Sequence, residues 1–258
     1  MCLMKRILSA AAVLALSASL LVGCSSGTAS SVPASASSAA ESTVSSVEET
    51  ASSAVDENEA AAAQLLNDLT GSYQELWPVI LADEYKQTWL DDCTALVGEE
   101  NAEVAFEKLS SMVTSDVYGE DAVEAYANGG GAYFCGFTNS LATLTFDGET
   151  STISGTDKDG NVLFSHTYHY IGMEPVRGLY EFESDDADSG EFTYFFLAPD
   201  TSAETYHIEF RYGSDAEALS QYDAGEYAYW LASGISTDCD QTMINNCIEL
   251  FCTENLAG

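Results

Sequence analysis

A change of hydrophobic period at Gly129-Gly130-Gly131 constrains the fold of this chain more than any other feature. Before the three glycines, apolar residues recur at the three- and four-residue spacing of amphipathic helices. After them, segments of strand length follow one another, separated by turn-forming pairs such as Asp147-Gly148 and Asp159-Gly160. Several short strands joined in sequence indicate an antiparallel meander, either a barrel or a sandwich.

The predicted elements follow from these patterns. We expect helical structure, broken at Gly71 and Pro78, where Leu65, Leu66, Leu69, Tyr73, Leu76 and Trp77 recur, and further helices over 83–96, 102–112, 121–127, 214–221 and 240–251. The predicted strands cover 132–138, 141–146, 151–154, 162–170, 178–183, 191–197 and 205–211. Ser214 is the expected N-cap of its helix, because Glu217 three residues later completes a capping-box pattern.

The first residues are typical of a secretory signal. Lys5 and Arg6 precede an apolar run, Ile7–Leu21, and small residues then lead to Cys24, as in the lipobox of bacterial lipoproteins. The run is short for a membrane span, which disfavours the alternative of a transmembrane anchor. We therefore expect residues 1–23 to be removed and Cys24 to carry acyl chains such as palmitate. The protein would then sit on the extracytoplasmic face of the cell membrane, touching the membrane only through its lipid anchor.

Composition separates a spacer from a folded domain. Residues 24–60 are mainly Ser, Ala, Thr, Val and Glu without aromatics, which predicts a disordered spacer, with helix beginning near Glu57 to Leu66. Residues 61–258 are enough for one domain. The chain has 7 Lys and Arg against 42 Asp and Glu, a net charge of −35. This balance excludes nucleic acid as a partner and disfavours docking onto anionic lipid.

Five cysteines remain after Cys2 and Cys24, and they are Cys93, Cys135, Cys239, Cys247 and Cys252. Because the number is odd, at least one thiol is unpaired or pairs between chains. We expect most of these cysteines to be buried and to pack as small hydrophobic side chains. A disulfide from Cys239 to Cys93 or Cys135 is the alternative. No CxxC motif occurs, which argues against a structural Cys₄ zinc site.

Three histidines are available for chemistry. His166 and His169 lie an odd number of residues apart on one predicted strand, so they face opposite sides and cannot share a metal. On the predicted strand 205–211, Thr205, His207 and Glu209 share a face, and the last two could supply two zinc ligands. The alternative is an ordinary strand histidine. No GxSxG, HExxH or P-loop motif occurs, so we do not expect an enzyme.

Several segments, in order, resemble the ZinT (YodA) family of zinc- and cadmium-binding domains. They are Leu66–Ile80, Tyr168–Gly172, Val176-Arg177 with Leu179–Phe182, and Ala198-Pro199 with Tyr206–Phe210 and Gly213-Ser214-Asp215. The resemblance implies an α+β, mainly antiparallel β fold: a calycin (lipocalin-like) barrel with N-terminal helices and a C-terminal helix. It spans about residues 62–251.

The metal site implied by this resemblance is depleted. The family's zinc ligands include a His-x-His pair, of which only His207 is present because Thr205 replaces the first histidine. A third histidine position falls at Phe195, give or take one residue, and the family's His-rich segment is replaced by the Ser/Ala spacer. Glu209, Glu204 and Asp200 are the remaining candidate ligands, and Glu209 ranks first because it shares the face of His207.

Two functions from different classes follow. The first is a lipid-anchored protein that binds zinc or another divalent ion and would supply an ABC-type metal importer. The second is a calycin domain that has lost its metal and binds a small organic ligand or a partner protein. Aromatic residues are plentiful, and most are expected in the core: Trp77, Trp89, Tyr133, Tyr168, Tyr170 and Tyr180. What lies around the His207 ring distinguishes the two functions.

Overall fold

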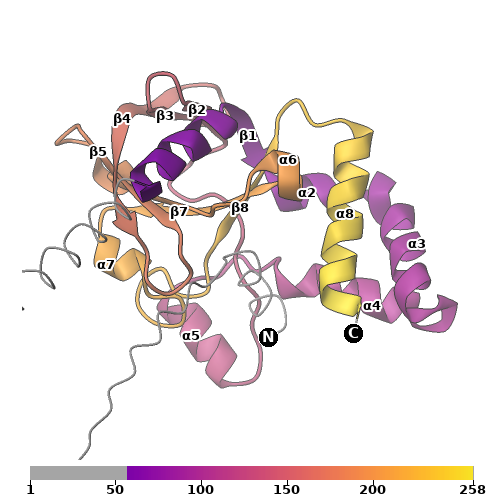
Figure 1. Ribbon diagram of the computed structural model, residues 1–258. Helices are drawn as coiled ribbons and strands as arrows, with labels where there is room; N and C mark the ends of the chain where they lie inside the picture. Colours follow the sequence, from indigo (N-terminus) through magenta and orange to yellow (C-terminus); the bar gives the residue numbers. More distant parts are fainter. Residues whose placement is uncertain (1–56, 258) are drawn as a thin grey trace, which may run out of the picture.

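Eight antiparallel strands close into a barrel in the computed structural model, which describes residues 57–257 (Figure 1). Each strand pairs with its neighbour in sequence, and β8 pairs with β1 to close the barrel. The predicted fold class, an antiparallel calycin-like barrel with added helices, is confirmed. The predicted signal peptide, Cys24 and most of the spacer lie outside the described residues, so the boundaries at residues 23 and 60 stay predictions.

The strands are short except for β4. They are β1 Gly71–Glu75, β2 Thr143–Asp147, β3 Thr152–Thr156, β4 Val162–Met173, β5 Tyr180–Ser184, β6 Tyr194–Leu197, β7 Ile208–Gly213 and β8 Ala232–Ser236. The central residue of β1, Tyr73, pairs with Leu144 on one side and with Ser236 on the other. Strand β1 therefore closes the barrel by pairing with β2 and with the last strand, β8.

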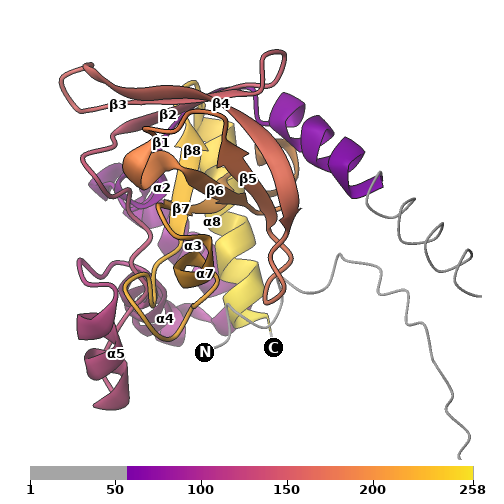
Figure 2. The ribbon, with the colours of Figure 1, turned by 90° about the vertical axis from the view of Figure 1, so that its left-hand side faces the viewer.

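Helices α3, α4 and α8 lie together at one side of the barrel, whereas the helix 57–68 lies elsewhere on the barrel (Figures 1 and 2). The helical segments are 57–68, α2 Leu76–Ile80, η2 Asp83–Tyr85, α3 Lys86–Val97, α4 Glu99–Met112, α5 Glu120–Ala127, η3 Gly190–Phe192, α6 Ser202–Thr205, α7 Ala216–Leu219 and α8 Gln241–Leu256. The C-terminal α8 packs on α3, α2 and α4. Among residues 57–257, no helix has both the length and the apolar character needed to span a membrane.

Two apolar cores hold these layers together. The barrel interior is filled by large rings, among them the fully buried Phe146, Phe182, Phe195 and Phe210. The second core lies between the helices and centres on the fully buried Trp89, whose indole nitrogen donates to a backbone carbonyl of α2 at 2.7 Å. Burying side chains of this size contributes about 1.5–3 kcal/mol each, so the two cores dominate the stability of the domain.

The structure corrects several predicted elements. The segment 71–75, predicted as helical, is strand β1, and 132–138, predicted as a strand, contributes only isolated bridges through Phe134. Strand β8 has no counterpart in the prediction. The N-cap of α7 is Asp215 rather than Ser214, because the Asp215 carboxylate accepts from the backbone N–H groups of Glu217 and Ala218.

All five cysteines of the described domain are free thiols, so the bridge from Cys239 to Cys93 or Cys135 is not formed. Four of them are buried, as expected for small hydrophobic side chains. Cys247 and Cys252 point in different directions from α8, as predicted. The Cys247 sulfur lies 3.9 Å from a nitrogen of His207, and the Cys252 sulfur lies 4.0 Å from the sulfur of Cys93.

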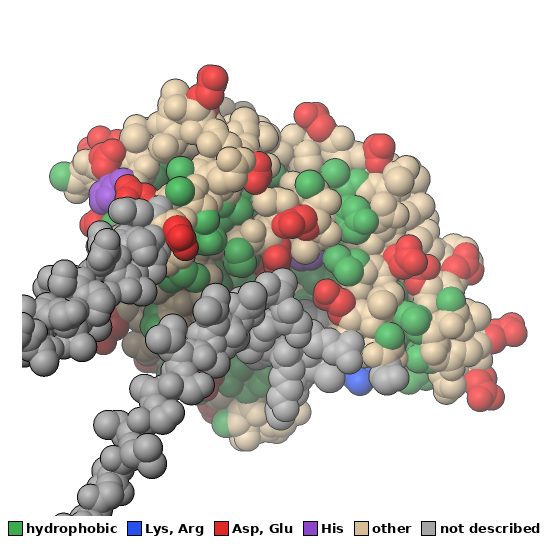
Figure 3. Space-filling view, in the orientation of Figure 1, with side chains coloured by type: hydrophobic (Ala, Val, Ile, Leu, Met, Phe, Trp, Pro, Cys, Tyr) green, Lys and Arg blue, Asp and Glu red, His purple; other side chains and the backbone are tan. Residues whose placement is uncertain are grey.

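Acidic side chains are spread over the face shown in Figure 3, where basic side chains are scarce. From residue 57 onward the chain has only five basic residues, Lys86, Lys108, Lys158, Arg177 and Arg211. Lys158 pairs with its neighbour Asp159 in an exposed turn. Arg211, in contrast, is completely buried. The two arginines, Arg177 and Arg211, are described with the site below.

Candidate ligand-binding site

His207 lies in the short link between α6 and β7. Tyr206 ends α6 in the left-handed conformation, with a φ of 66°. The His207 Nδ1 donates to the Thr205 carbonyl at 2.7 Å, with the Cys247 sulfur 3.9 Å away. The other ring nitrogen, Nε2, lies 4.0 Å from Oε1 of Glu209. The Thr205 carbonyl occupies Nδ1, so only Nε2 can face a carboxylate. Among the described residues, Glu209 is the one acidic side chain within ion-pair distance of it.

The electrostatics of this pair favour a charged imidazole. Burial lowers the pKa of His207, but the Cys247 sulfur, the Glu209 carboxylate and the Thr205 carbonyl outweigh it and raise the pKa to about 9. Burial also raises the pKa of Glu209, while His207 and Arg177 act in the opposite direction. At neutral pH an imidazolium therefore faces Glu209, and a metal ion would have to displace its proton before binding.

The other candidate metal ligands do not complete a site. Phe195, at the expected histidine position, is fully buried in the barrel core, and Thr205 belongs to α6 rather than to the strand predicted for it. Glu204 closes the capping box of α6. Burial and Glu204 raise the pKa of Asp200, while His207 lowers it. Within residues 57–257, no group of three or more His, Cys, Asp or Glu side chains is placed to hold a metal ion.

His166 and His169 lie on opposite faces of β4, as predicted. His166 stacks on Phe164 of the barrel core and its Nδ1 lies 2.7 Å from the Asp186 carboxylate. His169 is exposed and its Nδ1 lies 2.7 Å from the Asp185 carboxylate. Both pairs connect β4 to the loop between β5 and β6. These histidines therefore stabilise a loop and do not bind one ligand together.

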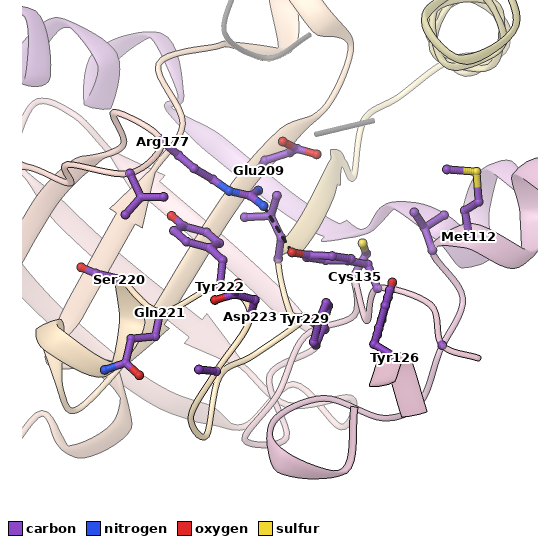
Figure 4. Close-up of a pocket in the computed structure, with 16 residues that line it drawn as sticks. Met112, Tyr126, Cys135, Arg177, Glu209, Ser220, Gln221, Tyr222, Asp223 and Tyr229 are labelled. Carbon is purple, nitrogen blue, oxygen red and sulfur yellow. Dashed lines mark hydrogen bonds between the residues drawn. The ribbon is translucent and has the colours of Figure 1, made fainter. Parts of the chain in front are cut away.

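A pocket with a volume of about 760 Å³ opens between the barrel and the helices α4 and α5 (Figure 4). Glu209 of β7 reaches its wall from the barrel, next to the His207 link. The remaining lining residues are Met112, Val113, Tyr126, Gly131, Tyr133, Cys135, Val176, Arg177, Ser220, Gln221, Tyr222, Asp223, Ala224, Tyr229 and Leu231. Pockets for small organic molecules measure about 300–1,000 Å³ and combine apolar or aromatic walls with few polar groups, as this one does.

Three tyrosines form one wall of the pocket. Tyr126 and Tyr229 stack with their ring centroids 3.8 Å apart, and Tyr133 meets both rings edge-on. Burial raises the pKa of Tyr126 to about 12, which keeps its phenol neutral. Gly131 makes this packing possible, because a Cβ there would come within 2.6 Å of the Tyr126 ring. The wall therefore presents flat, uncharged aromatic surface to the cavity.

Arg177 is the only basic residue among the lining residues of the pocket. It lies in the hairpin between β4 and β5, where the buried Glu174 carboxylate accepts from the backbone N–H groups of Val176 and Arg177 at 2.8 and 2.6 Å. Its guanidinium lies 4.0 Å from the centroid of the Tyr222 ring and donates to the Tyr133 hydroxyl at 3.3 Å. Figure 4 shows the guanidinium beside Tyr222 and directed into the pocket.

Arg211 holds the loop that contributes Gln221, Tyr222 and Asp223 to the pocket. Its guanidinium donates to the backbone carbonyls of Leu219, Gln221 and Tyr227, which hold the loop that follows α7. It also lies 4.4 Å from the centroid of the Tyr222 ring. Burial lowers the pKa of Arg211 to about 10, so the side chain stays charged at neutral pH. Two guanidinium groups thus contact one tyrosine ring.

The sequence singles out His207 and Glu209 as candidate ligands but does not indicate the pocket, which Glu209 lines and His207 does not. Tyr133 was expected in the core, and Tyr126, Tyr222 and Tyr229 were not singled out. Arg177 entered only as part of the family resemblance. One signal was available: apart from Arg6, Arg177 and Arg211 are the only arginines in an otherwise strongly acidic sequence. An isolated arginine in such a chain is a candidate for a specific role.

No family matches this sequence, and no curated protein matches it. Among solved structures, it is similar to the Zn(II)-bound ZinT-like domain of Streptococcus pneumoniae AdcA, with 15% sequence identity and a TM-score of 0.45, over 71% of this chain and 89% of that one. It is also similar to Zn(II)-bound AdcA from Streptococcus pneumoniae, with 15% identity and a TM-score of 0.41, over 75% of this chain and 35% of that one.

Proposed function

We propose that this chain is a binding protein that holds a small organic molecule in the pocket between the barrel and α5. The observation that carries the proposal is the cavity of about 760 Å³ with a tyrosine wall and a single basic residue. A site of this size and lining suits a compact ligand with one or more flat rings. The residues offer binding groups without a nucleophile–base arrangement, so we propose capture rather than catalysis.

We further propose that capture takes place outside the cytoplasm. The signal-like segment Ile7–Leu21 and the lipobox-like residues before Cys24 would tether the domain to the outer face of the cell membrane. The Ser/Ala-rich residues between Cys24 and the helix 57–68 would then act as a spacer. A tethered domain of this kind can collect a ligand close to the membrane for another component to take up.

Filling part of the pocket should weaken ligand capture. Ala224 is exposed at the edge of the pocket, and in Ala224→Trp the indole would occupy part of the cavity. We expect the affinity for the neutral probe 2-naphthylacetamide to fall at least about tenfold, as measured by isothermal titration calorimetry with the full chain, since one lost aromatic contact is worth about that factor. Val162→Trp adds the same side chain at an exposed position of β4 outside the pocket and should leave the affinity unchanged. Equal effects of both variants would refute the proposal.

A second candidate function, divalent-metal binding, is favoured by one observation, the 4.0 Å approach of His207 Nε2 to Glu209. A protein of this kind could supply a metal importer. Because the pKa of His207 is raised to about 9, protons compete with the metal at neutral pH.

If zinc binds here, its affinity should rise by about tenfold per pH unit between about pH 6.5 and 8, since each metal ion must displace one proton. Titration of zinc into the full chain at several pH values measures this slope. His207→Ala should abolish the binding, and His169→Ala, which removes an exposed histidine of β4, is the matched control. Zinc binding that persists in His207→Ala would exclude this site.

A further inference from the structure

Arg177 forms no ion pair, although its charge acts on Glu209 at longer range. In the described part of the chain, no carboxylate lies within ion-pair distance of its guanidinium. Its side chain donates instead to a neutral phenol, Tyr133, at 3.3 Å. In a chain with 42 acidic residues, an unpaired arginine is unusual, because any nearby acid would stabilise it. The open donors of this guanidinium face the cavity.

The guanidinium is also held in place before any ligand arrives. The carboxylate of Glu174, which is 1% exposed, accepts hydrogen bonds from the backbone of the hairpin and from the Tyr222 hydroxyl. Glu174 therefore fixes the backbone at Arg177 without forming an ion pair with the Arg177 side chain. The Tyr222 ring supports the guanidinium face at 4.0 Å. A planar fork of donors fixed in this way matches a carboxylate, which it can bind through two parallel hydrogen bonds.

The rest of the pocket limits what the ligand can carry. The tyrosine wall of Tyr126, Tyr133 and Tyr229 offers aromatic surface near the guanidinium. Glu209 and Asp223 also line the cavity, and a second anionic group on the ligand would be repelled by them. The charges therefore favour one negative group at Arg177 and an uncharged ring system elsewhere.

We propose that the ligand is a small monocarboxylate with a planar ring, bound with its carboxylate on Arg177 and its ring against the tyrosine wall. This inference rests on the proposed capture of a small organic molecule. It assigns Arg177 as the residue that determines specificity, and it makes Glu174 and Tyr222 positioning residues for its guanidinium.

A pair of probes that differ only in charge tests the inference. We expect 2-naphthylacetate to bind the full chain at least about tenfold more tightly than the neutral 2-naphthylacetamide in calorimetric titrations, because a charge-assisted bidentate pair replaces neutral contacts. Arg177→Gln should remove this preference, so that the two probes bind the variant with similar affinity, and circular dichroism checks that the variant is folded. Arg177→Lys, which keeps the charge but loses the fork, should retain part of the preference.

The outcomes separate this inference from the proposed function. If the amide binds in an Ala224→Trp-sensitive manner but the carboxylate binds no more tightly, the inference is overturned and the proposed function stands. A carboxylate preference that survives in Arg177→Gln overturns the inference as well. If neither probe binds, both fail.

Discussion

Replacing Arg211 with Met is expected to lower the free energy of unfolding by about 3 kcal/mol. Its guanidinium is fully buried and satisfies the carbonyls of Leu219, Gln221 and Tyr227 in the loop that follows α7. Each buried carbonyl left without a donor costs about 1–3 kcal/mol, and relief of the buried charge offsets part of the sum. Urea unfolding of the wild type and the variant, followed by circular dichroism, measures the difference.

The matched control is Lys108→Met on the exposed surface of α4, which removes the same charge from the same acidic protein. A surface change of this kind should alter stability by less than about 0.5 kcal/mol. If both variants lose the same stability, net charge rather than the buried contacts explains the effect. Because Arg211 also contacts Tyr222, its replacement should weaken the binding of 2-naphthylacetate as well.

Phe195→Ala is expected to cost about 3–5 kcal/mol, the usual range for deleting a large ring from a core. Phe195 is fully buried in β6, with its ring centroid 5.3 Å from that of Tyr212 and 5.4 Å from that of Tyr168. The strands around it are fixed by the closed barrel and can collapse only partly into the space left behind. Urea unfolding again provides the measurement.

Leu163→Ala on β4 serves as the control, because its side chain is an exposed large hydrophobic and should contribute less than about 1 kcal/mol. A loss below about 1.5 kcal/mol for Phe195→Ala would show that this part of the barrel is loosely packed. Phe195→His should also be destabilising, because it would bury a polar imidazole among aromatic rings of the barrel core.

Local signals predicted most of the elements. The turn pairs Asp147-Gly148 and Asp159-Gly160 separate β2, β3 and β4 as expected, and Asp240 caps α8 at the predicted place. The errors occur where strand formation depends on distant partners. Strand β1 continues the helical spacing of the residues before it, yet it pairs with β2 and β8, of which the second lies about 160 residues further along the chain.

The sequence by itself determined most of the helices and strands between β1 and β8, the antiparallel meander and the position of His207 close to Glu209, because hydrophobic period, turn residues and motif spacing act over a few residues. Only the tertiary structure decided where a ligand can bind. The pocket gathers Tyr126, Arg177, Glu209 and Tyr229 from separate parts of the chain, and their approach depends on barrel closure and on the loop that Arg211 holds. The same closure placed Phe195 in the core rather than beside His207, since the inward and outward positions of a strand are fixed by its register with its neighbours.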